Sequence, residues 1–173
     1  MFTTLAWAKH SQATTARAVS LHDLVRLSTR VARTTALEST AQSEDVGGER
    51  HIVTYSRLRV DELIHGGPVE SEIWVRTLGG KIDGLGEIVH GEAELALNQQ
   101  SIVFLRSDAD GVARVTAMAQ GHYPLLIDAA GAARLQASRN MPHLVANPAG
   151  SSAVSELSGK RIDEARSLIL GVR

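Results

Sequence analysis

The chain has 173 residues, of which 43% are hydrophobic and 21% charged, so it is long enough to form one domain with its own core and is not compositionally disordered. With 18 basic and 19 acidic residues the net charge is −1, and aromatic residues make up only 3%, so a nucleic-acid partner is not expected. The absence of cysteine excludes disulfides, thiolate nucleophiles and cysteine-ligated zinc. No apolar run approaches the roughly 20 residues of a membrane-spanning helix, so no integral membrane segment is predicted.

Residues 1–19 are predicted to be a flexible leader or the remnant of a signal peptide. Ala6-Trp7-Ala8 has the form of a signal cleavage site, although no basic segment precedes it and the apolar stretch is short. A frayed terminus and the end of a signal peptide with a mis-set start both fit this pattern. We expect a secreted, periplasmic or cell-surface location, and leave a cytoplasmic one open.

A short helix is predicted over residues 21–28. Ser20 and Asp23 have the spacing of a capping box, with Asp in place of the usual Glu. Leu21, Leu24, Val25 and Ser28 then fall on one helical face. This helix is expected to open a folded unit over residues 20–128.

The rest of that unit is predicted to be β-structure. The Thr- and Val-rich stretch 31–40 and the alternating stretch 51–61 are separated by Gly47-Gly48 and should form a hairpin. Further strands are expected at residues 73–75, 87–90, 101–105, 113–119 and 123–127. Residues 101–105 are continuously apolar, as in a strand buried on both faces. Five or six short strands without crossover helices predict an antiparallel barrel or sandwich.

Two further segments complete the chain. Residues 129–157 have little periodicity and are predicted to be irregular. Residues 158–171 are predicted to form a helix with Ile162, Ala165 and Ile169 on its apolar stripe and Gly171 at its end.

Several of these stretches resemble an uncharacterised bacterial family of exported proteins. The matching stretches are Val60 to Gly66, Ile73 to Gly80, Val89 to Gly91 and Ser101 to Leu105, within a likeness that covers about residues 20–127 and the last helix. The resemblance implies a five- to six-stranded antiparallel OB-like (netrin-like) barrel with a helix at each end. It is distantly similar to the inhibitory domain of tissue inhibitors of metalloproteases, which chelate the protease zinc through an N-terminal cysteine. This chain has no cysteine, so that mechanism does not carry over.

The glycine-rich loop Gly79–Gly86 is the first candidate for chemistry. Its backbone amides could cradle an anion, with Lys81, Asp83 and the following His90 as candidate binding residues, but the loop is not a phosphate-binding motif and no helix pattern follows it. The favoured interpretation is that its glycines supply positive φ angles and close strand crossing.

Other polar residues show no recognisable catalytic or metal spacing. Asp83, Glu87, Glu92 and Glu94 crowd this region and form either a cation site or, as we favour, a solvated rim. None of the seven histidines has a zinc-site spacing and no G-x-S-x-G elbow occurs, so neither a metal nor a cofactor is predicted.

Trp74 is the candidate for partner recognition, because alternation places it opposite Ile73 and Val75 and so either in the core or on a contact surface. The sequence as a whole favours a noncatalytic protein-binding or structural module, either protease-inhibitor-like or part of a surface assembly. Its partner would be another protein or further copies of the same chain. A small enzyme or an anion-binding protein using Gly79–Gly86 is the alternative.

Overall fold

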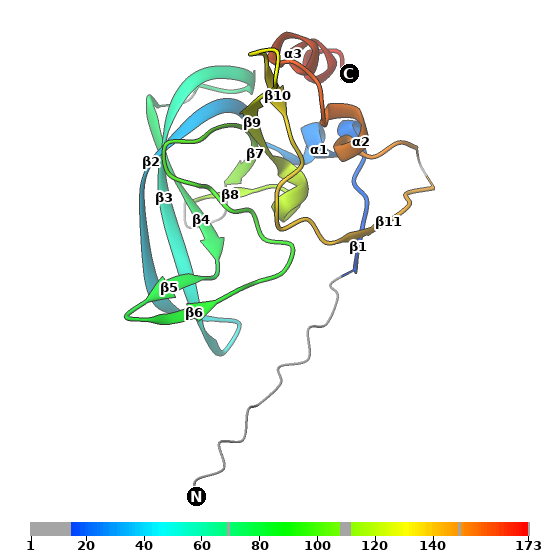
Figure 1. Ribbon diagram of the computed structural model, residues 1–173. Coiled ribbons are helices and arrows are strands. Elements are labelled where there is room, and N and C mark those ends of the chain that lie inside the picture. The colour runs from blue at the N-terminus through cyan, green and yellow to red at the C-terminus, as the bar shows by residue number, and fades with distance from the viewer. Residues whose placement is uncertain (1–14, 69, 108–111, 149, 173) are drawn as a thin grey trace, which may run out of the picture.

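The computed structural model of the protein describes residues 15–68, 70–107, 112–148 and 150–172 (Figure 1). Within this part of the chain the strands are β1 (Thr15–Arg17), β2 (Arg30–Val46), β3 (Glu49–Gly66), β4 (Glu72–Leu78), β5 (Gly80–Ile82), β6 (Leu85–Glu87), β7 (Gln100–Ser107), β8 (Ala113–Val115), β9 (His122–Ile127), β10 (Ala133–Leu135) and β11 (His143–Val145). The helices are α1 (Leu21–Leu27), α2 (Ala153–Leu157), α3 (Ile162–Leu170) and the 3₁₀ helix η1 (Met118–Gly121). None of the helices in these ranges is long and apolar enough to cross a membrane.

The main sheet closes on itself as a ring of five strands. Its order is β10-β9-β7-β2-β3-β4-β8, and β8 also pairs with β7 (Figure 1). All neighbours are antiparallel except β4 and β8, which are parallel at Val75↔Ala113 and Arg76↔Arg114. The prediction of a mainly β protein with a helix near each end is confirmed, but the prediction that all strands are antiparallel is wrong. Strand directions cannot alternate all the way round a closed ring with an odd number of strands, so one pair must be parallel.

The β2–β3 hairpin is the longest feature of the sheet. The two strands have 17 and 18 residues, so each extends well beyond the predicted 31–40 and 51–61. The pairing shifts register between Val31 and Ala32, between Arg33 and Thr34, and between Ala36 and Glu38. Such bulges bend and twist the strands, so one end of the hairpin curves into the ring while the other extends as an arm.

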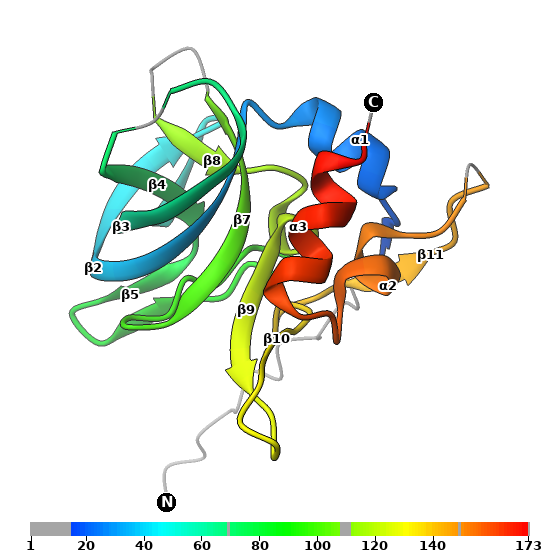
Figure 2. The same ribbon diagram turned by 90° about the horizontal axis from the view of Figure 1, so that it is seen from above.

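Strand β7 separates two hydrophobic cores. Val103 and Leu105 pack inside the ring, whereas Ile102 and Phe104 point to the other face, where α1, α2 and α3 gather (Figure 2). Phe104 meets Tyr123 edge to face with ring centroids 5.9 Å apart. All four of the named β7 side chains are at most 2% exposed. The prediction that this continuous apolar run is buried on both faces is therefore confirmed.

Helix α1 forms where the sequence predicts it. The backbone N–H of Asp23 donates to the Ser20 hydroxyl at 3.1 Å, which makes Ser20 the N-cap. Leu21, Leu24 and Val25 are buried, and Ser28 ends the helix. The local capping pattern and the 3.6-residue period were sufficient here because both act within one or two turns.

Two predicted strands are shorter in the structure. The strand expected over residues 87–90 overlaps only with Glu87, the last residue of β6. The strand expected over 113–119 ends at Val115, because Ala117 and Met118 adopt φ angles of 55° and 56° and lead into η1. The reason is tertiary. The Ala119 N–H donates to the Gly91 carbonyl at 2.8 Å, so it bonds to the connection between β6 and β7 and not to a neighbouring strand.

The terminal segments hold more regular structure than their composition indicates. Strands β10 and β11 and helix α2 lie within the stretch 129–157 that was expected to be irregular. Helix α3 starts at Ile162 rather than at residue 158, because the Glu164 carboxylate accepts from the Arg161 N–H at 2.8 Å and caps the helix there. Of the expected leader, residues 1–14 lie outside the described part of the chain, and residues 15–17 form β1 in parallel with β11.

Candidate functional site

A cavity of about 560 Å³ opens where the β2–β3 arm leaves the ring. One wall consists of hydroxyl side chains that project from the arm and from the end of β4, namely Ser39, Thr54, Ser56 and Thr77. The opposite wall is the connection from β6 to β7, chiefly residues 87–96. The volume is in the usual range for ligand pockets, about 300–1,000 Å³.

The connection that forms the second wall is held in place by a distant segment of the chain that also lines the cavity. The Asn140 side-chain amide donates to the carbonyls of Val89 at 2.8 Å and Glu92 at 3.2 Å. Because Asn140 follows β10 in the chain, the wall depends on a segment about fifty residues away. The bond from Ala119 to Gly91 adds a third attachment.

Gly79 and Gly80 also line the cavity, at a point where the backbone passes close to other strands. Their φ angles are 88° and 139°, and the Thr54 hydroxyl donates to the Gly79 carbonyl at 2.6 Å. A Cβ at Gly80 would lie 2.3 Å from the Thr54 Oγ1 atom, and one at Gly79 would lie 2.9 Å from the Glu87 carbonyl oxygen. This geometry agrees with the structural role that the sequence favours for these glycines, positive φ and close strand crossing.

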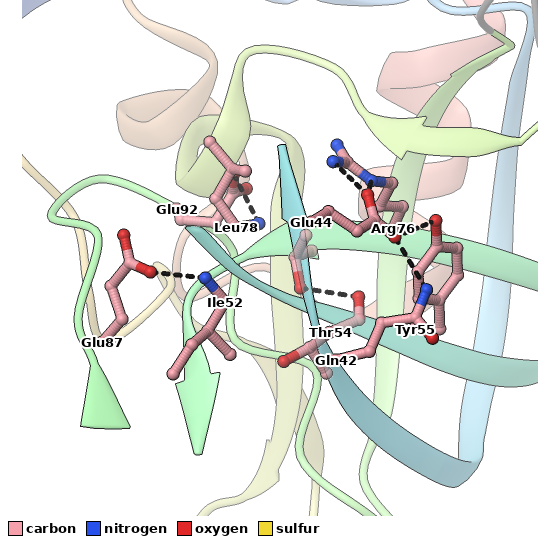
Figure 3. Close-up of polar contacts among 10 residues, drawn as sticks. Gln42, Glu44, Ile52, Thr54, Tyr55, Arg76, Leu78, Glu87 and Glu92 are labelled. Carbon is pink, nitrogen blue, oxygen red and sulfur yellow. Dashed lines mark hydrogen bonds and ion pairs between the residues drawn. The ribbon is translucent and has the colours of Figure 1, made fainter. Parts of the chain in front are cut away.

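Two carboxylates of the cavity anchor its walls (Figure 3). Glu92 accepts from the N–H groups of Ala93 at 2.9 Å and Leu78 at 3.3 Å, and its burial raises its pKa despite those bonds. Glu87 accepts from the Ile52 N–H at 2.6 Å, and its other oxygen lies 2.6 Å from His51 Nδ1. The hydrogen bond to Glu87 raises the pKa of His51.

A second polar network lies beside the cavity on β2, β3 and β4 (Figure 3). The Glu44 carboxylate accepts from Gln42, Tyr55 and Arg76, and both Nε and Nη2 of Arg76 bond to the same oxygen at 3.0 and 2.7 Å. Hydrogen bonds from Gln42, Arg76 and Tyr55 lower the pKa of Glu44 to about 2. This network ties the arm to β4 and so holds the first wall in place.

The four candidate residues from the sequence lie outside the cavity lining. Lys81 and His90 are exposed, and Asp83 occupies the turn between β5 and β6 with a φ of 48°. Trp74 is 45% exposed on β4 beside Arg57 of β3, so it belongs to the surface and not to either core. Its role in partner contact stays a prediction.

The residues that build the cavity were not singled out from the sequence as a group. One signal was present: the inward face of β3 starts with Thr54 and Ser56 before it turns apolar at Leu58. Hydroxyl side chains on the inner face of a ring need hydrogen-bond partners, so they indicate an end of the ring that is open to water. The contribution of Asn140 carries no local signal, because it reaches the site only through tertiary folding.

Neither a scan against protein-family models nor a search of curated proteins finds a match to this chain. In the part of the chain that the structure describes, no three His, Asp or Glu side chains gather as they would around a metal ion.

Proposed function

We propose that this protein is an exported, noncatalytic protein-binding module of OB-like, netrin-like architecture, which binds its partner at the rim of the cavity. The strand connectivity supports the architecture. Numbered in chain order, the five ring strands β2, β3, β4, β7 and β8 follow one another round the ring as 1-2-3-5-4, and the last returns to the first. This order supports the proposal of a five-stranded Greek-key closure of the OB type.

The observation that carries the binding role is a group of exposed apolar side chains on one connection. Leu85 is 73% exposed, Ile88 79% and Leu97 54%, and all three lie between β5 and β7. Ile88 also lines the cavity. Large apolar side chains at this exposure gain free energy when a partner covers them, so this connection, which borders the cavity through Ile88, is a candidate interface.

The charge of the rim indicates the kind of partner. Glu87, Glu92 and Glu94 line the cavity together with one basic residue, Arg139. Such a surface attracts a partner that presents positive charge among apolar residues. The same carboxylates oppose a phosphate or another anion at Gly79–Gly80, which weighs against the anion-binding alternative.

A small enzyme or ligand-binding protein is the second candidate, and the cavity beside the glycines favours it. Against catalysis, both acids with named partners are already engaged: Glu92 by two backbone amides and Glu87 by Ile52 and His51. A general acid or base needs a carboxyl that can reach substrate, so these two act better as anchors than as reactants.

Partner capture tests the proposal. The wild-type protein is used as bait in an extract of the cells that express it, beside a variant with Leu85→Ser and Ile88→Ser. Ile127→Ser is the matched control, because Ile127 is 71% exposed but lies on β9, away from the rim. A protein retained by wild type and control but lost with the double variant supports the proposal. A Trp74→Ala variant is assayed beside these proteins. Equal retention by all of them, or loss only with Trp74→Ala, would place the interface elsewhere. Mass spectrometry of the mature N-terminus tests export, and an intact Met1 argues against it.

A further inference from the structure

We propose that the cavity receives a lysine side chain from the partner protein. This inference rests on the proposed function and adds the chemical group that the site recognises. Three features of the described residues point to a ligand with an apolar stem and a positively charged end: an unpartnered buried hydroxyl, an excess of carboxylate, and an apolar side wall.

The first feature is the hydroxyl of Ser56. The residue is 1% exposed and lines the cavity, yet its hydroxyl makes no hydrogen bond to any described residue. Its neighbour on the same wall, Thr54, is already bonded to Gly79. Buried polar groups are nearly always paired in folded proteins, so a vacant hydroxyl that faces a cavity marks a place for a ligand atom.

The second feature is charge. Of the cavity carboxylates, Glu94 is exposed and makes no hydrogen bond or ion pair with any described residue, whereas Glu87 and Glu92 are held by the backbone. Three acidic residues and one basic residue, Arg139, line the cavity, so acidic side chains outnumber basic ones there. A cation that enters therefore meets a free carboxylate at the mouth and further negative potential behind it.

The third feature is the apolar part of the lining. Leu78, Val89, Ala93 and Leu95 border the same space as the hydroxyls and acids. Lysine has a flexible four-carbon stem that packs on apolar surface and a compact ammonium with three donors. Those donors suit single oxygen acceptors on different walls, such as Ser56 and Glu94, better than the planar fork of arginine does.

An NMR titration tests the inference. Nα-acetyl-lysine N-methylamide is added to ¹⁵N-labelled protein, and the amide signals of Gly79, Gly80 and Ala93 are followed. The norleucine analogue has a similar stem without the ammonium, and the arginine analogue carries the other cation. We expect the lysine analogue alone to shift these signals strongly, with an affinity that falls as salt is added. Equal shifts with norleucine or arginine, or none with lysine, would overturn the inference.

Two variants locate the contact. Glu94→Gln removes the free carboxylate and Ser56→Ala the vacant hydroxyl, and each should weaken lysine-analogue binding about threefold to tenfold. Asp163→Asn is the control, since it removes an exposed charge from α3 and should leave binding unchanged. Unchanged binding in both cavity variants would overturn the inference.

Failure here is distinguishable from failure of the proposed function. If the partner is captured through Leu85 and Ile88 but the lysine analogue neither binds nor competes, the binding module stands and the lysine site falls. If the analogue binds as expected and no partner depends on the rim, the lysine site stands and the proposed interface falls.

Discussion

Replacement of Glu44 by glutamine should destabilise the protein in a pH-dependent way. Glu44 joins β2 to β4 through Arg76, whose side chain is only 6% exposed. Glutamine keeps the shape of the side chain but turns one acceptor into a donor, so its single oxygen cannot replace both carboxylate oxygens, one of which accepts from Arg76 and the other from Tyr55 and Gln42. The buried Arg76 charge would then lack its carboxylate, and an uncompensated buried charge is costly.

The magnitude follows from the pKa of Glu44. The hydrogen bonds to Gln42, Arg76 and Tyr55 lower it from 4.5 to about 2. At about 1.4 kcal/mol for each unit of pKa, this difference corresponds to at most about 3.5 kcal/mol of folding free energy. Because 23% of the Glu44 side chain is exposed, water screens part of the interaction. We therefore expect Glu44→Gln to lower the free energy of unfolding by about 1–2 kcal/mol at pH 7.

The sign of the pH dependence is fixed by the direction of the shift. A carboxyl whose pKa is lower in the folded state contributes its full stabilisation above the unfolded value of 4.5 and loses it as the pH falls toward 2. The stability difference between wild type and Glu44→Gln should shrink over that interval. Urea unfolding followed by circular dichroism, at several pH values between 7 and 2.5, measures it.

A control variant separates this network from general charge effects. Glu70→Gln removes an exposed carboxylate that has no partner among the described residues, so it should match wild type at every pH. The reasoning is refuted if Glu44→Gln unfolds at the wild-type urea concentration at pH 7, or if its deficit stays constant down to pH 2.5.

Three further changes have outcomes that the structure sets. Burial lowers the pKa of His122 to about 4. Between pH 6.5 and 4 the imidazole is therefore protonated in the unfolded chain but not in the folded protein. Wild-type stability should therefore fall by up to about 3 kcal/mol as the pH drops from 6.5 to 4, and His122→Gln should flatten that fall in urea titrations. Gly121→Ala places a Cβ 2.0 Å from the Thr116 carbonyl oxygen and should cost several kcal/mol, whereas Gly67→Ala meets nothing within 4 Å and should leave the thermal midpoint nearly unchanged or slightly raised. Leu24→Ala empties a fully buried site under α1 and should cost about 2–5 kcal/mol by denaturant unfolding; a loss below 1 kcal/mol would contradict the packing described for that helix.

The success of sequence prediction varied with the range of the interactions involved. The end of α1 at Ser28 and the turn at Gly47-Gly48 follow from neighbouring residues, and both are found in the structure. The length of the β2–β3 hairpin does not follow from neighbouring residues, because the pairing includes three shifts of register that belong to the bending of the ring. The strand expected over residues 87–90 ends at Glu87 for a similar reason: residues 88–90 lead into a turn held by Asn140.

The candidate site was harder to predict than the fold. The acidic residues after the glycine loop are visible in the sequence as a rim, but the binding candidates that the sequence offers are Lys81, Asp83 and His90, with Trp74 for partner contact. The cavity needs Ser56, Thr77 and Asn140 together, which are separated by up to 84 residues in the chain and share no motif. Proximity of this kind arises only when the sheet closes.

The order of residues along the chain was enough to determine the N-cap at Ser20 and the two-faced burial of β7, because each depends on backbone geometry and on the polarity of near neighbours. Tertiary structure alone decided that β8 lies parallel to β4, that a hydroxyl-lined cavity opens beside the arm, and that Leu85 and Ile88 remain in water. These features depend on contacts between residues that are distant in the chain. The free energy of those contacts is shared among several segments, so no single stretch of sequence specifies it.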